Sequence, residues 1–353
     1  MCFRNLIIRA MQEQEKYAVC VRCMTYNQSK YIEDALDGFC MQETSFPYVC
    51  LIVDDASTDG EQEIIAQYLT RNFDVNDTLT SRKEETDDYL LSFVHHSKNM
   101  NCYFAVLFLK YNHWGKKSKL PYYKEWMDSS KYTAICEGDD YWIDSSKLQK
   151  QVSFLEDNPD YLMCYGRCFH YYQNTNKLSM RKFGGSSVTF EEFLKGNTVP
   201  TPTTLFRVDA VNNYTRLFGE EEKRWAMGDY PKWLYFAHEG KIYFSQDVYA
   251  VYRVLANSAS HDADEAKSER FVYNTFGISK YFADYYQMPH LYDENQLNKA
   301  LFTHAVKFGN RDEALIRFKK IKRPSLKHRL KYFIMKYCFL YNICKGRLFY
   351  THI

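Results

Sequence analysis

The chain has 353 residues, which is enough for one large domain or a domain and a half with a sizeable core. Its net charge is +2, but eleven Lys or Arg and no Asp or Glu lie between residues 317 and 353, so the rest of the chain is mildly acidic. This balance disfavours a nucleic-acid-binding module, because binding to a phosphate backbone needs a broad positive surface.

Strand and helix patterns alternate from the start of the chain. Residues 17–24 are β-rich and precede a segment, 32–39, whose apolar residues recur at helical spacing. The continuous apolar run 48–55 and the helical period of 61–73 repeat this unit, with Asp59 as a candidate helix cap. Two strand–loop–helix units are therefore predicted in succession.

The alternation continues to about residue 160. Residues 74–88 are polar and charged without an apolar period, so we expect a surface insertion there. After it, the sequence predicts strands over 89–95 and from Tyr132, and helices over 104–110, 122–128 and 145–159. Such alternation is typical of a three-layer α/β fold, with a mostly parallel mixed sheet covered by helices on both faces.

The pattern changes in the second half of the chain. Beyond residue 160 the sequence predicts strands over 162–172 and 201–207, a strand or hairpin over 242–253, and helices over 188–196 and 228–240. From Glu265 onward the pattern is helical. We therefore expect one domain over residues 1–260, divided into halves at about 15–160 and 161–260, and a helical region over 261–353.

The cysteines and the apolar runs bear on the compartment. Eleven cysteines without a paired framework indicate free thiols in a reducing environment. The CxxC formed by Cys20 and Cys23 lies in a predicted strand, where these positions face opposite sides, so neither a disulfide nor a shared metal is expected. The apolar patch at 6–8 is far shorter than that of a signal peptide, and no window approaches 18 uninterrupted apolar residues. These features predict a cytoplasmic protein.

Acidic and polar residues stand where the predicted strands end. The clusters are Thr25-Tyr26-Asn27, Asp54-Asp55 and the Asp139-Asp140 pair within EGDDYW. Ligands of parallel α/β sheets bind beyond the carboxyl ends of the strands, so these clusters mark a candidate site. Each residue also has a structural interpretation, as a helix cap or as a packed loop residue.

The residue types at these strand ends suit a sugar nucleotide and a cation. Adjacent strand residues point in opposite directions, so Asp139 and Asp140 should have different roles. One carboxylate together with a diphosphate is sufficient for a hard cation such as Mg²⁺, and the other could accept hydrogen bonds from a sugar or ribose hydroxyl. Tyr26 and Asp55 offer a flat face and a hydrogen-bond acceptor for a base. We expect Gly138 to allow the backbone to approach the ligand.

Three motifs together resemble the family 2 glycosyltransferases of the GT-A fold. They are TYN after the first strand, VDDASTD after the second, and EGDDYW with KLQKQVSFLE after the fourth, and the likeness covers residues 15 to 255. The EGDDYW element is the most specific of them and is typical of a bacterial subgroup. The resemblance implies an inverting, metal-dependent enzyme that moves a sugar from a nucleotide-sugar donor, most simply a UDP-sugar, to a hydroxyl group.

The resemblance also implies roles for residues of the first half. Thr25, Tyr26, Asn27 and Asp55 would bind the nucleotide, and Asp139 would bind the ribose or the donor sugar. Asp140 would bind Mg²⁺ or Mn²⁺ that bridges the diphosphate. Asn99, in the SKN after the predicted third strand, resembles an Asn that the family places at a strand end, and it is a further candidate for nucleotide binding.

Three candidates lie in the second half. An inverting enzyme needs a general base for the acceptor hydroxyl, and the matching position in AMGDYPKWL gives Asp229, although Gly228 stands where the family often has an acidic residue. An Asp before a helix also serves as a cap. Arg253 closes the last strand and could contact the diphosphate. His261 is a candidate second metal ligand, although a lone His is more often structural.

The basic C-terminal region admits two interpretations. One helical stripe holds Leu330, Phe333, Ile334, Tyr337, Cys338 and Tyr341, with Lys and Arg alongside, which is typical of a helix on an anionic membrane surface. The alternative is a helix packed on the catalytic domain. A membrane role would suit a glycan or lipid-linked acceptor in capsule or lipopolysaccharide synthesis.

Two other functions are alternatives to the transferase. A sugar nucleotidyltransferase can share such a sheet, but it needs a Gly-rich, basic loop after the first strand, and TYNQSK is not such a loop. A nucleic-acid-binding module could use the basic, aromatic tail, but the acidic remainder of the chain disfavours it. The donor sugar, the acceptor and the oligomeric state do not follow from the sequence.

Overall fold

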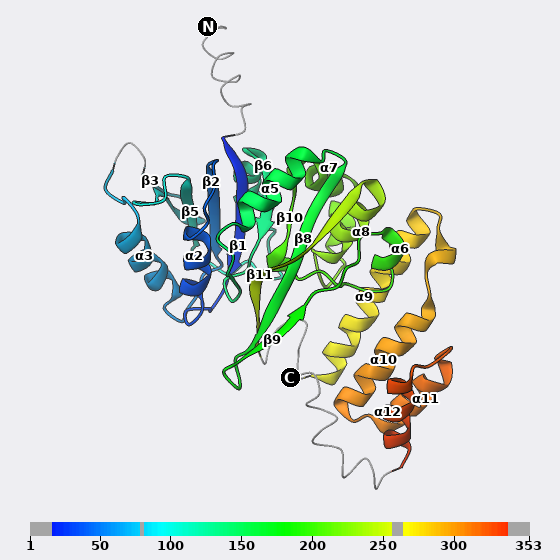
Figure 1. The fold of residues 1–353 in the computed structure, drawn as a ribbon. Coiled ribbons are helices and arrows are strands. Elements are labelled where there is room, and N and C mark those ends of the chain that lie inside the picture. The colour runs from blue at the N-terminus through cyan, green and yellow to red at the C-terminus, as the bar shows by residue number, and fades with distance from the viewer. Residues whose placement is uncertain (1–15, 78–80, 256–263, 338–353) are drawn as a thin grey trace.

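The computed structural model describes residues 16–77, 81–255 and 264–337 (Figure 1). Its centre is one mixed sheet of eleven strands in the order β3-β4-β5-β2-β1-β6-β10-β8-β11-β7, with β9 paired to β8. His261 lies outside the described residues, so its predicted role as a metal ligand has no structural counterpart here.

The first half of the chain builds the parallel part of the sheet. β1 is parallel to both β2 and β6, and β2 is parallel to β5, so the carboxyl ends of these four strands share one edge. Helices follow β1, β2, β5 and β7, whereas β3, β4 and β5 succeed one another without a helix between them. The elements are β1 (Tyr17–Thr25), α2 (Ile32–Cys40), β2 (Tyr48–Asp54), α3 (Glu61–Asn72), β3 (Arg82–Glu85), β4 (Tyr89–His95), β5 (Cys102–Leu109), α4 (Leu120–Asp128), β6 (Ser130–Ile135), β7 (Tyr141–Trp142) and α5 (Lys147–Asp157).

The prediction of a helix over 104–110 was wrong, because this stretch lies in strand β5. All of β5 except Tyr103 is buried, and the strand is covered on both faces. A short apolar run without a polar side does not distinguish a central strand from a buried helix. The predicted strand over 89–95 is β4, but it runs antiparallel to β5.

The second half extends the sheet with antiparallel pairs. β10 is antiparallel to β6 and to β8, whereas β8 and β11 are parallel to each other. Helix α7 had no counterpart in the sequence-based prediction. The elements are β8 (Tyr161–Tyr172), β9 (Lys177–Phe183), α6 (Phe190–Phe193), η1 (Thr201–Thr203), β10 (Leu205–Arg207), α7 (Val208–Glu222), α8 (Tyr230–Glu239) and β11 (Lys241–Val254).

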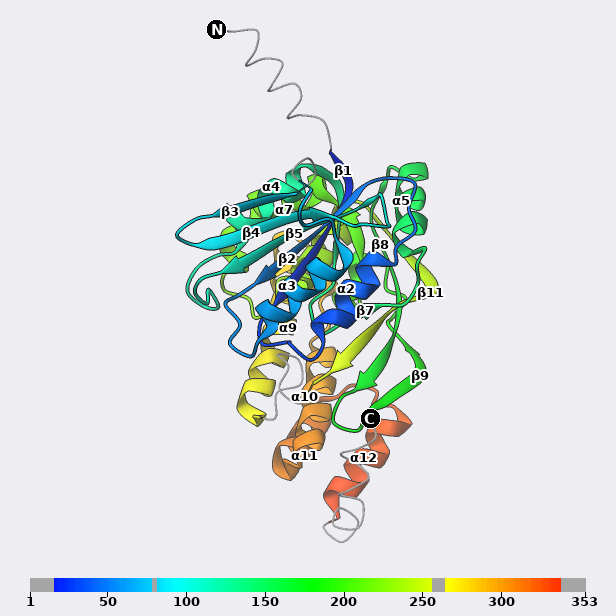
Figure 2. The same cartoon turned by 90° about the vertical axis from the view of Figure 1, so that its left-hand side faces the viewer.

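Helices cover both faces of the sheet, as expected. Alternate residues of β1 face opposite layers: Val21 and Cys23 pack with α2, α3 and α5, and Cys20 packs in the core that includes α4. Figure 2 shows α2 and α5 to one side of the sheet and α4 and α7 to the other. Cys20 and Cys23 thus point to different cores, as the CxxC spacing predicted, and both are free thiols.

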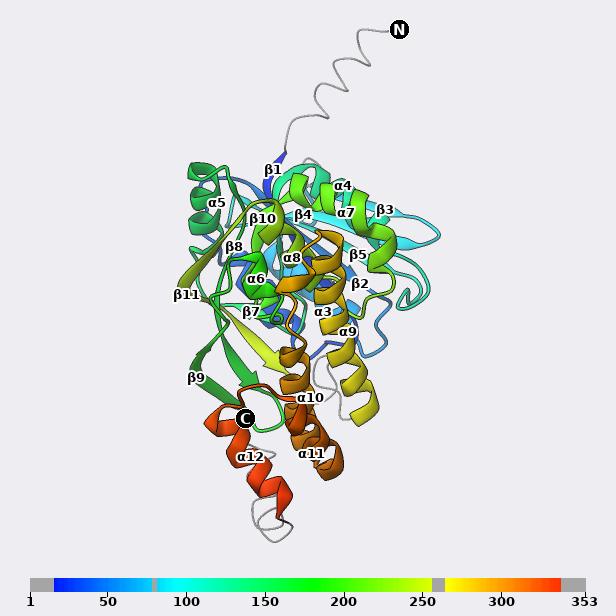
Figure 3. The ribbon, with the colours of Figure 1, turned by 90° about the vertical axis from the view of Figure 1, so that its right-hand side faces the viewer.

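The C-terminal region is helical, as predicted. Its first helix packs against the sheet domain through Phe282, which contacts Phe218 and Trp225. The remaining helices enclose a small core of their own beyond the sheet (Figure 3). None of the helices that the structure describes combines the length and apolar character needed to cross a bilayer. The elements are α9 (Glu265–Tyr285), η2 (Pro289–Leu291), α10 (Glu294–Phe308), α11 (Arg311–Lys320) and α12 (Leu326–Lys336).

Candidate functional site

The loops after β1, β2 and β6 meet at the carboxyl edge of the sheet. The Asp55 N–H donates to the Thr25 carbonyl at 3.0 Å, which joins the first two loops. The Gly138 N–H lies 3.3 Å from the Met24 carbonyl oxygen, which joins the third loop to the first. The polar clusters that the sequence placed at separate strand ends are therefore neighbours in space.

Gly138 allows this contact between loops. A Cβ at this position would lie 2.5 Å from Thr25 Oγ1 and 2.5 Å from Gln28 Oε1. Any larger residue would therefore push the EGDD turn away from the Thr25–Gln28 loop. The small residue is needed at this position for loop packing, and not only for the approach of a ligand as we expected from the sequence.

The loop after β1 is held by Glu61, a residue that the sequence analysis missed. The Glu61 side chain is fully buried and accepts hydrogen bonds from Thr25 Oγ1, from the Gln28 N–H at 2.8 Å and from Ser57 Oγ at 2.8 Å. Burial raises the pKa of Glu61, and these hydrogen bonds oppose the shift. An acidic residue in the first turn of a helix is ordinary, so nothing in the sequence singled it out.

The same loop presents Tyr26 to solvent. Asn27, with φ of 55°, accepts a hydrogen bond from the Thr58 N–H at 2.8 Å and donates its own N–H to Ser57 Oγ at 2.9 Å. Tyr26 between these anchored residues keeps 45% of its surface exposed. It lines a cavity of about 800 Å³, together with Ser57, Gln62, Leu90, Phe108 and Asn112 among others. An exposed ring on an anchored loop can stack on a flat ligand.

Asp55 is not open to solvent. Only 2% of its side chain is exposed, and Oδ1 accepts the His113 N–H at 2.8 Å while Oδ2 pairs with Lys119 Nζ at 2.7 Å. The carboxylate thus anchors the loop between β5 and α4. A base N–H could bind Asp55 only by sharing or replacing one of these partners, which the sequence did not suggest.

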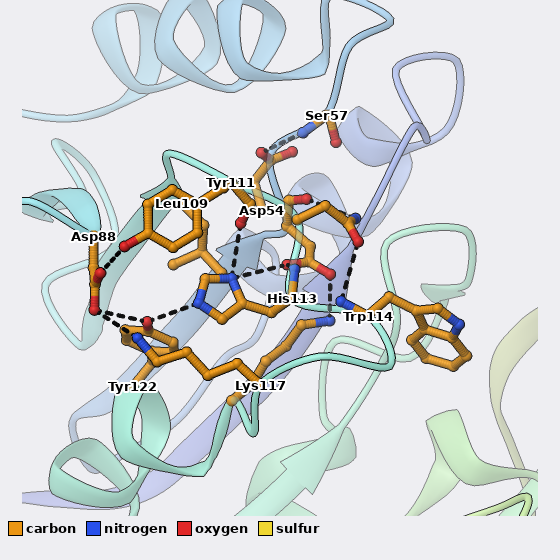
Figure 4. A network of polar contacts seen from close by, with 12 residues as sticks. Asp54, Ser57, Asp88, Leu109, Tyr111, His113, Trp114, Lys117 and Tyr122 are labelled. Atoms are coloured by element: carbon orange, nitrogen blue, oxygen red, sulfur yellow. Dashed lines mark hydrogen bonds and ion pairs between the residues drawn. The ribbon is translucent and has the colours of Figure 1, made fainter.

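A polar network continues from Asp55 into this loop (Figure 4). His113 is buried, and its Nδ1 donates to the Tyr111 carbonyl at 2.7 Å. Its Nε2 lies 3.0 Å from the Tyr122 hydroxyl, which in turn lies 3.3 Å from Asp88 Oδ2. Asp88 also pairs with Lys117 at 2.8 Å and accepts the Tyr111 hydroxyl. These contacts fix the position of Lys119 through the loop.

The EGDD turn concentrates three carboxyl groups. Burial raises the pKa of Glu137 to about 7, although Arg22 acts in the opposite direction. Burial also raises the pKa of Asp139. The pKa of Asp140 is raised well above its ordinary value, first by burial and then by the charge of Asp139. Among the residues that the structure describes, no group of three or more acidic, His or Cys side chains is placed to hold a metal ion. A divalent cation here would therefore rely on one or two carboxylates of the turn together with ligand and water oxygens, and it would favour the charged forms of these carboxylates.

Arg253 holds this turn in place. Its backbone N–H donates to Asp140 Oδ1 at 2.7 Å, and its Nε donates to the Asp139 carbonyl at 2.8 Å. The remaining guanidinium nitrogens bind Gln173 at 2.8 Å and Asp34 at 2.6 Å. The side chain is only 6% exposed, so Arg253 positions the acidic turn. The prediction of a diphosphate contact does not fit these engaged and buried nitrogens.

Asp229 reaches the same edge from the second half of the chain. It precedes α8 and accepts the Tyr230 N–H at 2.8 Å through Oδ1, as a helix cap does. Its Oδ2 accepts the Thr201 hydroxyl at 2.9 Å. Thr201 comes just before β10, which runs antiparallel to β6, so this threonine lies at the end of β6 that carries the EGDD turn.

The EGDDYW aromatics complete the connection between the halves. Trp142 is buried, and its Nε1 donates to the Pro202 carbonyl at 2.7 Å, next to Thr201. Tyr141 and Trp142 form the short strand β7, which pairs with β11 just before Arg253. The two aromatic residues therefore fix the acidic turn between the first and second halves of the domain.

Asn99 does not belong to this site. Because β4 is antiparallel to β5, its carboxyl end lies at the opposite edge of the sheet, where β2 and β5 begin. The Asn99 Nδ2 binds the carbonyls of Cys40 at 3.0 Å and Gln42 at 2.8 Å. The structure therefore places Asn99 apart from the other candidate residues, because the strand before it is antiparallel to β5.

Residues 20–99 match the family model described as Glycosyl transferase family 2. Uncharacterized proteins of Mycobacterium bovis and Mycobacterium tuberculosis are 29% identical over 195 residues, which is 52% of this chain and 45% of theirs. The chain thus matches less than half the length of these curated relatives.

Two solved structures are also similar. The mannosyltransferase PcManGT from Pyrobaculum calidifontis, solved with GDP-Man and Mn²⁺, aligns with a TM-score of 0.51 and 13% identity over 94% of this chain and 88% of that one. Residues 1–349 of TarS from S. aureus align with a TM-score of 0.44 and 15% identity over 93% and 91% of the two chains. The first likeness shows the GT-A fold that the resemblance implied.

Proposed function

We propose that the chain is a family 2 glycosyltransferase, as the match of residues 20–99 to that family model supports, and that it moves a sugar from a nucleotide-sugar donor to a hydroxyl of a glycan or lipid-linked acceptor. The observation that carries the proposal is the junction of three strand-end loops and Asp229 at one edge of the sheet. It combines an exposed aromatic ring, a crowded acidic turn and a carboxylate from the opposite half.

The donor is a UDP-sugar held mainly by the first half. Tyr26 stacks on the base, and Thr25 and Asn27, which Glu61 and Ser57 anchor, keep the loop in place around it. Asp139 accepts hydrogen bonds from hydroxyls of the ribose or the donor sugar. Asp55 fixes the surrounding loop through its ion pair with Lys119. It accepts a hydrogen bond from the nucleotide base if the base displaces the Lys119 ammonium group. Tight anchoring reduces the entropy that nucleotide binding costs.

Asp140 is the residue of this chain that would hold Mg²⁺ or Mn²⁺. The raised pKa of Asp140 reflects a crowded carboxyl group that gains from a neighbouring cation. When bound, the cation neutralises charge on the departing diphosphate. Arg253 keeps the Asp140 oxygen oriented through its backbone N–H, so the turn is preorganised before any ligand arrives.

Asp229 acts as the general base of an inverting reaction. Its Oδ1 is engaged with the Tyr230 N–H, and its Oδ2 accepts only hydroxyl and amide hydrogens from Thr201 and Asn197. An acceptor hydroxyl can take the place of one of these donors and give up its proton to Oδ2 as its oxygen attacks the anomeric carbon. General-base catalysis of this kind contributes about 10²–10⁴-fold to rate.

We propose that the protein acts in the synthesis of bacterial surface polysaccharides. It would work in the cytoplasm, beside the inner face of the plasma membrane. Acceptors of this chemistry can be carried on a lipid. The basic C-terminal region supports such a position.

The test is a panel of nucleotide sugars assayed for Mn²⁺- or Mg²⁺-dependent hydrolysis and for metal-linked binding of UDP by calorimetry. Asp140→Ala should lose the metal-linked part of binding. Asp229→Asn should keep donor binding, because Asn caps helices as well as Asp does, and should lower transfer about 10²–10⁴-fold. Equal loss of binding and transfer in Asp229→Asn would remove it as the base, and no binding of any nucleotide by the unaltered chain would refute the transferase.

A further inference from the structure

Helix α12 carries apolar residues on two opposite faces. One face packs inward, where Met335 is fully buried in the small C-terminal core and Tyr332 stacks on Phe318 with 4.0 Å between ring centroids. The other face is exposed to solvent. Its residues are Leu326, Leu330, Phe333 and Tyr337, exposed by 85%, 62%, 50% and 46%.

These four side chains form a narrow stripe. A helix turns by about 100° per residue, so Leu326, Leu330, Phe333 and Tyr337 fall within an arc of roughly 60°, and Met335 points to the opposite side. Packing against α10 and α11 therefore accounts for the buried face and leaves the stripe unexplained. Four adjacent exposed apolar side chains are more than the scattered apolar residues of an ordinary surface.

Cations border the stripe on both sides. Lys327 lies on one flank, and Arg329 and Lys336 lie on the other, as the same helical geometry requires. None of these three has an ion pair among the residues that the structure describes. Lys319, Lys320, Lys322 and Arg323 precede the helix, and no Asp or Glu occurs after residue 316. The segment from Lys319 to Lys336 is therefore positively charged throughout, although the first turn of α11, which Arg311 joins to the end of α12, carries Asp312 and Glu313.

We infer that α12 docks flat on an anionic bilayer surface. The stripe would enter the boundary between headgroups and acyl chains, and the flanking cations would meet lipid phosphates. A second copy of this chain fits less well, because two copies would bring the Lys and Arg side chains that flank the stripe against each other. The structure packs one face of α12 on α10 and α11 rather than on the sheet domain, and the opposite face points outward.

The inference rests on the exposure and charge of α12. Only its biological meaning, bringing the enzyme to a lipid-linked acceptor, rests on the proposed transferase function. Nucleotide binding and membrane binding can therefore fail separately, because the acidic turn and α12 belong to different cores.

Co-sedimentation of the full chain with vesicles tests this inference. We expect binding to phosphatidylcholine vesicles that contain phosphatidylglycerol, and weak binding to phosphatidylcholine alone. The double variant Leu330→Glu/Phe333→Glu should bind at least about tenfold more weakly, and Lys327→Glu/Arg329→Glu should lose the preference for anionic lipid. The matched control is Leu217→Glu, which alters a residue of α7 that is 47% exposed and should leave binding unchanged.

Three results would overturn the inference. They are absence of vesicle binding by the unaltered chain, binding that survives Leu330→Glu/Phe333→Glu, and an oligomer in sedimentation velocity that these two substitutions dissociate. The last result would identify the stripe as an interface between copies. Circular dichroism and UDP calorimetry on each variant check that the fold and the donor site are intact, so a folding defect is not mistaken for lost membrane binding.

Discussion

Lys119 Nζ lies 2.7 Å from Asp55 Oδ2, and the two side chains are 20% and 2% exposed. This pair joins the start of α4 to the end of β2. Asp55 is the residue that the family resemblance assigned to the nucleotide base. A nucleotide bound as the resemblance implies would therefore meet Lys119 as well as Asp55. The geometry makes Asp55 an anchor of the loop that contains His113.

Lys119→Met should destabilise the protein by about 1–3 kcal/mol, because it leaves a buried carboxylate without its cation. Adding Asp55→Asn should recover part of this loss, so the two effects should not be additive in urea denaturation. The surface pair of Lys124 and Asp128 supplies the control, since removing an exposed pair should cost less than about 1 kcal/mol. Additive effects of the two site substitutions would show that the contact does not contribute.

Glu61→Gln should weaken the loop that carries Tyr26. An amide cannot accept from Thr25, Gln28 and Ser57 together, and each unsatisfied buried group costs about 1–3 kcal/mol. If the loop binds the nucleotide as proposed, we expect a higher KM for the donor with a smaller change in kcat, since the loop lies apart from the proposed base. Steady-state kinetics against Glu63→Gln, an exposed neighbour in α3, provide the comparison. Equal KM values in both variants would contradict the role of Glu61.

Arg253→Lys should lower transfer about 10–100-fold, although the charge is kept. A lysine cannot reproduce the bonds to the Asp139 carbonyl, Gln173 and Asp34, so the acidic turn would shift, and small displacements of reacting groups have effects of this size. Initial rates at saturating donor measure the effect. Arg71→Lys, which alters an exposed ion pair with Glu33, should be neutral; a similar loss there would mean that the assay reports general instability.

Lys147→Met should stabilise the protein at neutral pH and lose this advantage in alkali. Burial lowers the pKa of Lys147 to about 7, with its Nζ 2.7 Å from Gln151 Oε1 and 4.2 Å from the centre of the Trp142 ring. Between pH 7 and 10.5 the Lys147 side chain is protonated in the unfolded chain but neutral in the folded protein. The free energy of unfolding of the unaltered chain therefore rises with pH over this range, and the destabilisation that Lys147 causes is largest below pH 7.

Chemical denaturation of both proteins at a series of pH values measures the difference directly, because other titrating groups are shared and cancel. The gap between the variant and the unaltered chain should shrink by up to about 1.4 kcal/mol per pH unit over this range. A gap independent of pH would mean that Lys147 keeps its ordinary proton affinity in the fold.

Local patterns predicted the features that depend on neighbours along the chain. The succession of strand and helix, the acidic strand ends, Asp229 before its helix and the helical C-terminal region all follow from periodicity and short motifs, and the structure contains each of them. Such features arise from backbone preference and from which side chains can be buried, and both are written in short segments.

Other features depended on segments far apart in sequence. They are the direction of β4, the strand conformation of residues 102–109, and the partners of Asp55, Glu61 and Arg253. Whether an apolar run pairs on both sides as a central strand, or which cation approaches a carboxylate, is set by long-range packing that no local period encodes. The acidic residues of the candidate site could therefore be predicted from the motifs, whereas the contacts that orient these residues form only in the folded chain.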